Sequence, residues 1–117
     1  PYCAHEGIGV LAYSPLARGQ LARSGSTARA AAEGATATGD AAIVAAVRAV
    51  AAARGVPPAR VALAWVLGRP AVTAPIVGVN RPGQVDDAVA AVDLELTAEE
   101  TDALEAPYVP REPYGFE

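Results

Sequence analysis

The sequence predicts a parallel α/β fold. Two short apolar runs, residues 7–12 and 74–79, each end at a polar, turn-forming segment, and helix-forming sequence follows each of them. The order strand, loop, helix, repeated along a chain, is typical of folds with parallel strands. In such folds the ligand binds beyond the carboxyl ends of the strands. We therefore expect the loops after the two runs to lie side by side and to hold one anionic ligand.

The first strand is expected over residues 8–13, because Ile8, Val10 and Leu11 form a dense apolar run that suits a strand buried on both faces. Residues 14–39 are expected to form a loop. Its part from Ser24 to Gly39 is rich in small residues, and we expect it to be mobile.

Four helices and a second strand are expected in the rest of the chain. A helix over 41–54 would be capped by Asp40 and ended by Gly55. The next, over 58–67, would begin at Pro58, since proline is favoured in a first turn. The second strand is expected over 74–79, with Pro75 near its start because proline lacks a ladder donor.

The remaining two helices follow the second strand. One is expected over 82–92, with Asn80 or Arg81 as its cap. Apolar residues at i, i+3, i+4 and i+7 would give this helix a buried stripe: Val85, Ala88, Val89 and Val92. Thr97 and Glu100 form a capping box for a short helix that ends near Glu105. An extended tail over 106–117 would complete the chain.

Composition limits the possible functions. The 117 residues are 52% hydrophobic with a net charge of −4, which is typical of a soluble globular domain and weakly disfavours nucleic acid as a partner. No apolar run is long enough to span a membrane and no signal peptide is visible, so we expect a cytoplasmic protein without a membrane partner. All nine basic residues are arginine, with one histidine and one cysteine. We therefore expect no catalytic lysine and no metal site.

The whole chain, 1–117, is interpreted as one partial domain. Two strands cannot form a stable sheet alone, so their open edges need further strands from the rest of the same barrel or sheet, or from another chain. Because the sequence begins with Pro1 rather than Met, we expect a fragment rather than a complete gene product.

The loop after the first strand carries groups suited to phosphate. Ser14 offers a hydroxyl, Pro15 stiffens the turn, and Arg18 offers a guanidinium fork. Tyr13, at the end of the strand, could stack on a planar ring. The alternatives stay open: a plain turn with a surface arginine, and a tyrosine that belongs to the core.

The loop after the second strand also suits an anion. Gly78 would let a ligand lie against the backbone, and Asn80, Arg81 and Gln84 follow at the beginning of a helix. Free N–H groups and the positive end of the helix dipole favour phosphate there, and Arg81 adds a full charge. The alternative is an asparagine cap beside a solvated arginine.

Four segments together resemble the C-terminal part of the aldo/keto reductases. They are residues 7–10 with 13–19, residues 61–67, residues 75–84, and residues 94–100 before Leu104. The resemblance implies an α/β fold that is the C-terminal portion of a (β/α)8 TIM barrel. It would comprise strands 7 and 8 with their helices, a C-terminal helix and a tail.

The resemblance also implies NADPH as the cofactor and assigns residues to it. Tyr13 would stack on the nicotinamide. Four residues of the first loop would line the diphosphate: Ser14, Pro15, Leu16 and Arg18. Five residues of the second loop and helix would hold the adenosine and its 2′-phosphate: Gly78, Asn80, Arg81, Gln84 and Asp87. Ala88 stands where many members have an asparagine that reaches the adenine, so that contact is not expected here.

The family's catalytic Asp, Tyr, Lys and His come from earlier strands, and none maps onto this chain. By resemblance, the parent protein would be an oxidoreductase that reduces a small carbonyl substrate to an alcohol, and the chain alone would be inactive. Two other readings remain: a non-catalytic NADPH-sensing accessory subunit resembling channel β subunits, and a structural half-barrel that binds nothing.

Overall fold

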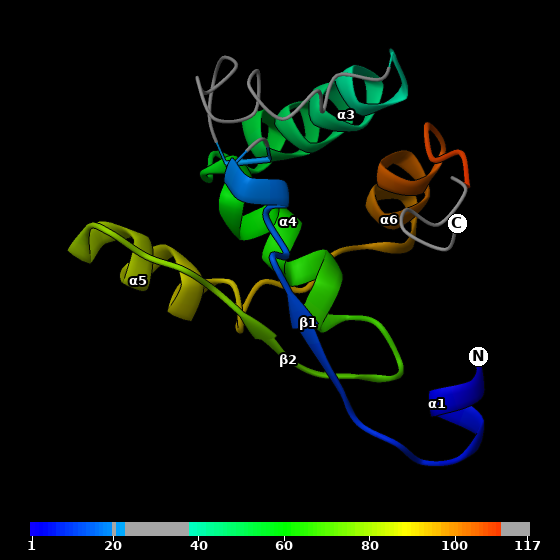
Figure 1. Ribbon diagram of the computed structural model, residues 1–117. Coiled ribbons are helices and arrows are strands. Elements are labelled where there is room, and N and C mark those ends of the chain that lie inside the picture. The colour runs from blue at the N-terminus through cyan, green and yellow to red at the C-terminus, as the bar shows by residue number, and fades with distance from the viewer. Residues whose placement is uncertain (20, 23–37, 111–117) are drawn as a thin grey trace.

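The computed structural model describes residues 1–19, 21–22 and 38–110. The two strands are separated along the chain by a turn and two long helices, and two further helices follow the second strand (Figure 1). In chain order the elements are α1 (Tyr2–His5), β1 (Val10–Tyr13), the 3₁₀ helix η1 (Ala17–Gly19), α3 (Thr38–Arg54), α4 (Pro58–Leu67), β2 (Val72–Ile76), α5 (Pro82–Ala90) and α6 (Ala98–Glu105).

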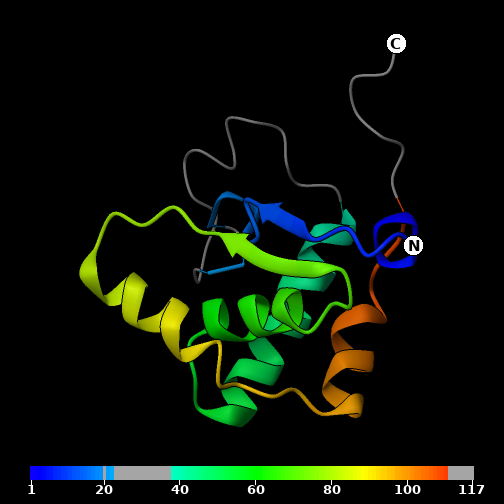
Figure 2. The ribbon, with the colours of Figure 1, turned by 90° about the horizontal axis from the view of Figure 1, so that it is seen from below.

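The strands β1 and β2 are parallel neighbours, as the sequence predicts. Their register pairs Val10 with Val72 and Tyr13 with Ile76, with one irregularity between Val10 and Leu11. The helices α4, α5 and α6 all lie on one side of the two strands (Figure 2). The described part of the chain is therefore a two-stranded sheet with a layer of helices on one face.

The core lies within the helical layer rather than around the strands. Its buried members come from α3, α4 and α6: Val47, Val50, Ala51, Val61, Ala62 and Leu104. Leu16 and Leu21, which follow β1, pack against this cluster and tie the first loop to the helices. Among the described residues no single helix is long and apolar enough to cross a membrane, although Ala41–Arg54 and Pro58–Leu67, bent by 105°, reach that length and apolar content together.

Local sequence signals set several helix ends as predicted. Helix α4 spans Pro58–Leu67 with proline in its first turn. Gly55 ends α3 in the left-handed region, at φ +65°, where glycine carries no Cβ penalty. At the start of α6 the predicted capping box is present: Glu100 N donates to Thr97 Oγ1 (3.2 Å), and Thr97 N donates to Glu100 Oε2 (2.9 Å).

Several predicted boundaries are wrong. Helix α3 begins at Thr38 rather than at residue 41, so position 40 lies inside the helix and not before it. Strand β2 spans Val72–Ile76, two to three residues earlier than predicted, which puts Pro75 near its end. An edge strand tolerates proline because half of its N–H groups point away from the ladder.

The first loop and the ends of two helices also differ from prediction. The expected loop over 14–39 contains the 3₁₀ helix η1, closed by the Gly19 N to Leu16 O hydrogen bond (2.9 Å). Most of the segment expected to be mobile lies outside the described residues. Helix α5 ends at Ala90, two residues before the predicted end.

The predicted burial of β1 on both faces is wrong for the described structure. Along β1 the side chains alternate between half-buried and exposed, and Leu11 is 62% exposed. The predicted buried stripe of α5 is open as well, with Val89 63% and Val92 67% exposed. At these exposed fractions, no described element buries either surface. The sequence pattern correctly identified apolar surfaces, but their predicted burial is not present among the described residues.

Candidate functional site

The two predicted loops begin at paired residues of the sheet. Tyr13 and Ile76 are register partners at the carboxyl ends of β1 and β2. Because the strands are parallel, the segments after them leave the same edge of the sheet. The structure thus brings together the two loops that the sequence predicts as one ligand site, although their residues lie more than sixty positions apart in the chain.

Tyr13 is the most exposed side chain of β1. Its exposed fraction is 81%, which excludes the core role that the sequence left open for it within the described structure. The alternation along the strand places Tyr13 on the same face as Leu11, opposite the helices. An aromatic ring that is held at a strand end and is this exposed among the described residues is available to stack on a planar group.

The backbone after Tyr13 is unusual for residues with side chains. Ser14 and Ala17 both adopt left-handed conformations, at φ 52° and 47°. A hydrogen bond from Ala17 N to Ser14 O (3.0 Å) closes the turn between them. Non-glycine residues in this region cost about 1 kcal/mol or more each, and such strain concentrates at ligand-binding segments. The loop is therefore a tight, strained turn rather than an extended connection.

Two of the predicted diphosphate residues anchor this turn to the fold. Leu16 packs against the core cluster, and Pro15 lines an apolar cavity between the sheet and the helices. Any contact that they make with a ligand must use their backbone or the part of the side chain left uncovered. The side chain of Arg18 lies outside the described part of the chain, so its predicted role stays a prediction.

The second loop leaves open space beside its backbone. Gly78 is exposed, and a Cβ atom placed there would meet no heavy atom within 4 Å. Asn80 and Arg81 are also exposed, and Arg81 is the N-terminal cap of α5. The first turn of α5 contains no acidic residue. An anion approaching this end of α5 would meet the helix dipole and the Arg81 charge without a competing carboxylate in that turn.

Gln84 has a structural partner inside the loop. Its Oε1 accepts hydrogen bonds from Asn80 N (2.8 Å) and Arg81 N (3.1 Å). This is the reciprocal half of a capping box, with glutamine at the third helical position. Sequence reasoning assigned Gln84 to the ligand and missed the cap, although the spacing from Arg81 to Gln84 was a usable signal. In the structure Gln84 shapes the loop, while its side-chain nitrogen has no partner among the described residues.

Asp87 is held by an arginine that the sequence did not single out. Its Oδ1 accepts a hydrogen bond from Arg60 Nε and lies near Arg60 Nη2, both at 2.9 Å, and each side chain is about 30% exposed. This ion pair joins α5 to α4. Asp87 therefore orients α5, and through it the loop that contains Arg81, whatever it contributes directly to a ligand.

Another ion pair joins the end of α3 to the start of α6. Arg54 donates to both carboxylate oxygens of Glu100, from Nε (2.5 Å) and Nη2 (2.6 Å), and Nη2 also donates to Glu95 O (3.1 Å). The Arg54 hydrogen bonds, aided by the Thr97 N–H, lower the pKa of Glu100 to about 2. This pair joins α3 to α6. Neither residue belongs to the loops that follow β1 and β2.

Comparison with known proteins agrees with this geometry. Residues 1–108 match the model of the aldo/keto reductase family. The chain is 40% identical over 122 residues to versiconal hemiacetal acetate reductase of Aspergillus parasiticus, covering 95% of this chain and 35% of that protein. It is 38% identical to the aldo-keto reductase AMT2 of Alternaria alternata and to the aldo-keto reductase dtxS3 of Metarhizium robertsii, each over 97% of this chain and 33% of the relative. The chain thus spans about a third of the length of these relatives.

Proposed function

This chain belongs to the aldo/keto reductase family, and we propose that it is the NADPH-binding C-terminal part of a (β/α)8 barrel oxidoreductase that reduces carbonyls to alcohols. Its strands would be the seventh and eighth of that barrel. Further strands, from the same barrel or from another chain, would cover the open edges of β1 and β2. The carbonyl substrate would be a small molecule bound mainly by loops of the remaining units.

The observation that carries the proposal is that the loops after β1 and β2, both with exposed groups suited to a ligand, leave the same edge of the sheet. Tyr13 is exposed beside a strained turn, and Gly78 leaves its backbone open next to the Arg81 end of α5. These features suit opposite ends of a long, flat, anionic molecule. The space beside Gly78 and the absence of an acidic residue in the first turn of α5 fit a phosphate-bearing cofactor.

The residues would divide the cofactor between them. Tyr13 would stack on the nicotinamide, and the Ser14–Arg18 turn would hold the diphosphate. Gly78, Asn80 and Arg81 would contact the adenosine and its 2′-phosphate, with Gln84 and Asp87 fixing the shape and tilt of that segment through their observed partners. Bound NADPH supplies the hydride for carbonyl reduction.

No proton-donating group of the proposed reaction is assigned to this chain. It contains no lysine and a single histidine, His5, which lies in α1 before β1 begins. In a barrel the amino ends of the strands form the face remote from the chemistry. We therefore assign the general acid, and the residues that orient it, to the units that would complete the barrel.

Arg81→Ala tests the phosphate end of the site. The variant is made in a chimera in which this chain replaces the matching third of versiconal hemiacetal acetate reductase. Loss of a charge-assisted contact to phosphate is worth about 1.5–3 kcal/mol, so we expect the Kd for NADPH to rise roughly 10- to 100-fold. Isothermal titration calorimetry measures that change.

The same titration with NADH is the matched control. NADH lacks the 2′-phosphate, so its Kd should change much less than that of NADPH when Arg81 is removed. A chimera that binds NADPH equally well with and without Arg81 would contradict the assignment. A chimera that folds and binds neither nucleotide would contradict the proposed cofactor role of the whole segment.

A further inference from the structure

One arginine outside the proposed cofactor site is linked to it by side-chain contacts. Arg60 lies in the first turn of α4. Its Nε and Nη2 atoms both lie 2.9 Å from Oδ1 of Asp87, a residue of α5. The two side chains are 31% and 28% exposed, so salt and water screen this ion pair less than they screen a fully exposed one. Arg60 therefore helps to set how α5 lies against α4.

Arg60 also lies at the end of the fold where the proposed site is. Helix α4 leads directly into β2, so it runs opposite to the parallel strands and begins near the edge at which they end. Helix α5 follows β2 and begins at the same edge, with Arg81 as its N-terminal cap. The pair between Arg60 and Asp87 thus joins the two helices close to the loops that would hold the cofactor.

Few other contacts fix the position of α5 among the described residues. The helix has no buried residue, and Val85 and Val89 are 46% and 63% exposed. Its C-terminal cap, Ala91, is 1% exposed, so the end remote from the loops is held by burial. Within the described ranges no second side-chain hydrogen bond or ion pair joins α5 to α4. Loss of the contact at Asp87 would therefore leave the amino end of α5 without its lateral support.

The contact at Asp87 continues into the loop that presents Arg81. Gln84 precedes Asp87 by three positions, so the two side chains share one face of α5. Gln84 Oε1 accepts hydrogen bonds from Asn80 N (2.8 Å) and Arg81 N (3.1 Å). At 1.5 Å per residue, Arg81 lies about 9 Å from Asp87 along the helix. A change in tilt at Asp87 would thus displace Arg81, and hydrogen bonds weaken steeply when their geometry is lost.

We infer that Arg60 is a positioning residue that sets the preference of this site for NADPH over NADH, because it holds Asp87 and so keeps Arg81 where the 2′-phosphate binds. The inference rests on the proposed function and adds to it a residue that acts through another side chain. NADH lacks the 2′-phosphate, and the proposed contacts of Gly78 and Asn80 to the adenosine lie in the loop before α5. Loss of Arg60 should therefore weaken NADPH binding more than NADH binding.

The test introduces Arg60→Met into the chimera described above. We expect the Kd for NADPH to rise roughly 3- to 5-fold, since a partly exposed ion pair contributes modestly, and the Kd for NADH to change less than about 1.5-fold. Arg60→Lys keeps the charge on a single donor nitrogen and should raise the Kd for NADPH only about twofold. Isothermal titration calorimetry measures both constants, and circular dichroism checks each fold. If the methionine variant unfolds, the lysine variant, as the milder change, decides the inference.

A second measurement separates positioning from direct contact. In the Arg81→Ala chimera, Arg60→Met should change the Kd for NADPH less than about 1.5-fold, because the contact that Arg60 positions is already absent. An arginine that bound the phosphate by itself would weaken binding by the same factor with and without Arg81.

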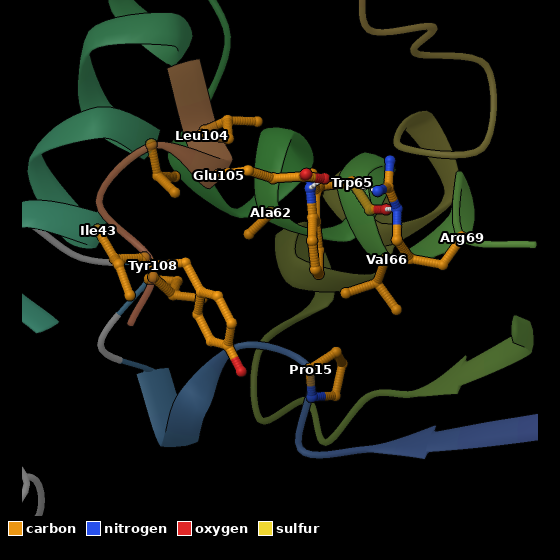
Figure 3. A pocket seen from close by; sticks show the side chains of 11 residues that line it. Pro15, Ile43, Ala62, Trp65, Val66, Arg69, Leu104, Glu105 and Tyr108 are labelled. Atoms are coloured by element: carbon orange, nitrogen blue, oxygen red, sulfur yellow. Dashed lines mark hydrogen bonds and ion pairs between the residues drawn. The ribbon is translucent and has the colours of Figure 1, made fainter. Parts of the chain in front are cut away.

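Arg69→Met is the matched control for a general loss of stability. Arg69 Nη1 donates to Glu105 Oε1 (2.6 Å) of α6, and these side chains are 32% and 43% exposed. Both residues, with Trp65, lie at a cavity that no residue of α5 lines (Figure 3). The variant therefore breaks a similar ion pair without touching α5. Its Kd values for NADPH and NADH should both stay within about 1.5-fold of the unaltered chimera.

Three results would overturn the inference: equal weakening of NADPH and NADH by Arg60→Met, equal effects of Arg60→Met and Arg69→Met on the Kd for NADPH, or independent losses from Arg60 and Arg81. If Arg81→Ala weakens NADPH binding and Arg60→Met does not, the inference fails and the proposed function stands. An unaltered chimera that binds neither nucleotide would refute the proposed function, and this inference with it.

Discussion

Gly9, directly before β1, lies close to the side chain of Thr73 in β2. A Cβ atom placed on Gly9 would lie 2.3 Å from Thr73 Oγ1 and 3.5 Å from Thr73 Cβ. Thr73 belongs to β2 and is stiff at χ1, so its side chain cannot swing away freely. The next residue, Val10, donates its N–H to Ala71 O (2.9 Å). Gly9 therefore leaves room for the Thr73 side chain at the point where the β1–β2 ladder begins.

Gly9→Ala should destabilise the fold because either β1 or Thr73 must move. Overpacking of this kind costs about 1–3 kcal/mol, measurable as a lower midpoint in urea unfolding of the 117-residue chain. The double variant Gly9→Ala/Thr73→Ala should recover most of the loss. Gly78→Ala is the matched control, since it faces open space, and should stay within about 0.5 kcal/mol. Equal effects of the two alanines would refute this account of Gly9.

At the scale of elements, the fastening of α3 to α6 should be visible as a pH dependence. The Arg54 hydrogen bonds hold the pKa of Glu100 near 2, below its ordinary value of 4.5. A carboxyl whose pKa is lower in the folded chain stabilises the fold above the unfolded pKa, and that contribution is lost as pH falls from about 4.5 to about 2. We expect the unfolding free energy to decline across this range more steeply with Glu100 than without it.

Glu100→Gln should remove the Glu100 part of that decline, and Arg54→Met should remove most of it. The contribution of Glu99 must be distinguished from that of Glu100. The pKa of Glu99 is also lowered, chiefly by a hydrogen bond from its own backbone N–H and then by one from the Thr97 side chain. That shift does not involve Arg54, so part of the acid dependence should persist in the Arg54 variant. Urea titrations at several pH values measure the slopes; an unchanged slope in Glu100→Gln would contradict the pairing.

The elements also show what a sequence can and cannot specify. Proline, glycine and the Thr97–Glu100 spacing act within one turn, so the limits of α4 and α6 were predictable. The Arg54–Glu100 and Arg60–Asp87 pairs join residues 46 and 27 positions apart, and no local pattern encodes which arginine meets which carboxylate. The wrong start of α3 has a related cause, since Asp40 is acceptable both as a cap and inside a first turn.

At the scale of the molecule, one pattern had two possible meanings. The apolar run of β1 predicts a strand that is buried on both faces. In the structure helices lie on one face, and Leu11 and Tyr13 are exposed on the other. The position of the candidate site was predictable, because parallel strand ends share an edge. The cap formed by Gln84 was also predictable, from its spacing to Arg81. The role of Asp87 was not, because its partner Arg60 lies 27 positions away.

The same open surfaces lead to the last prediction, that the purified 117-residue chain does not reduce carbonyls with NADPH. Electrostatic and stacking contacts from two loops can hold a cofactor, but carbonyl reduction also needs a proton donor placed at the carbonyl oxygen and a site that excludes water. Tyr13 is 81% exposed, so a nicotinamide against it would remain in contact with solvent on the uncovered side. The rate of NADPH oxidation is monitored as the loss of NADPH absorbance in the presence of an aromatic aldehyde. This rate should equal the rate measured without protein. The chimera that adds the remaining units is the positive control, because it restores the cover and the acid together. Turnover by the isolated chain, abolished by Tyr13→Ala, would show that the donor lies within these 117 residues and would refute the division of the barrel proposed above.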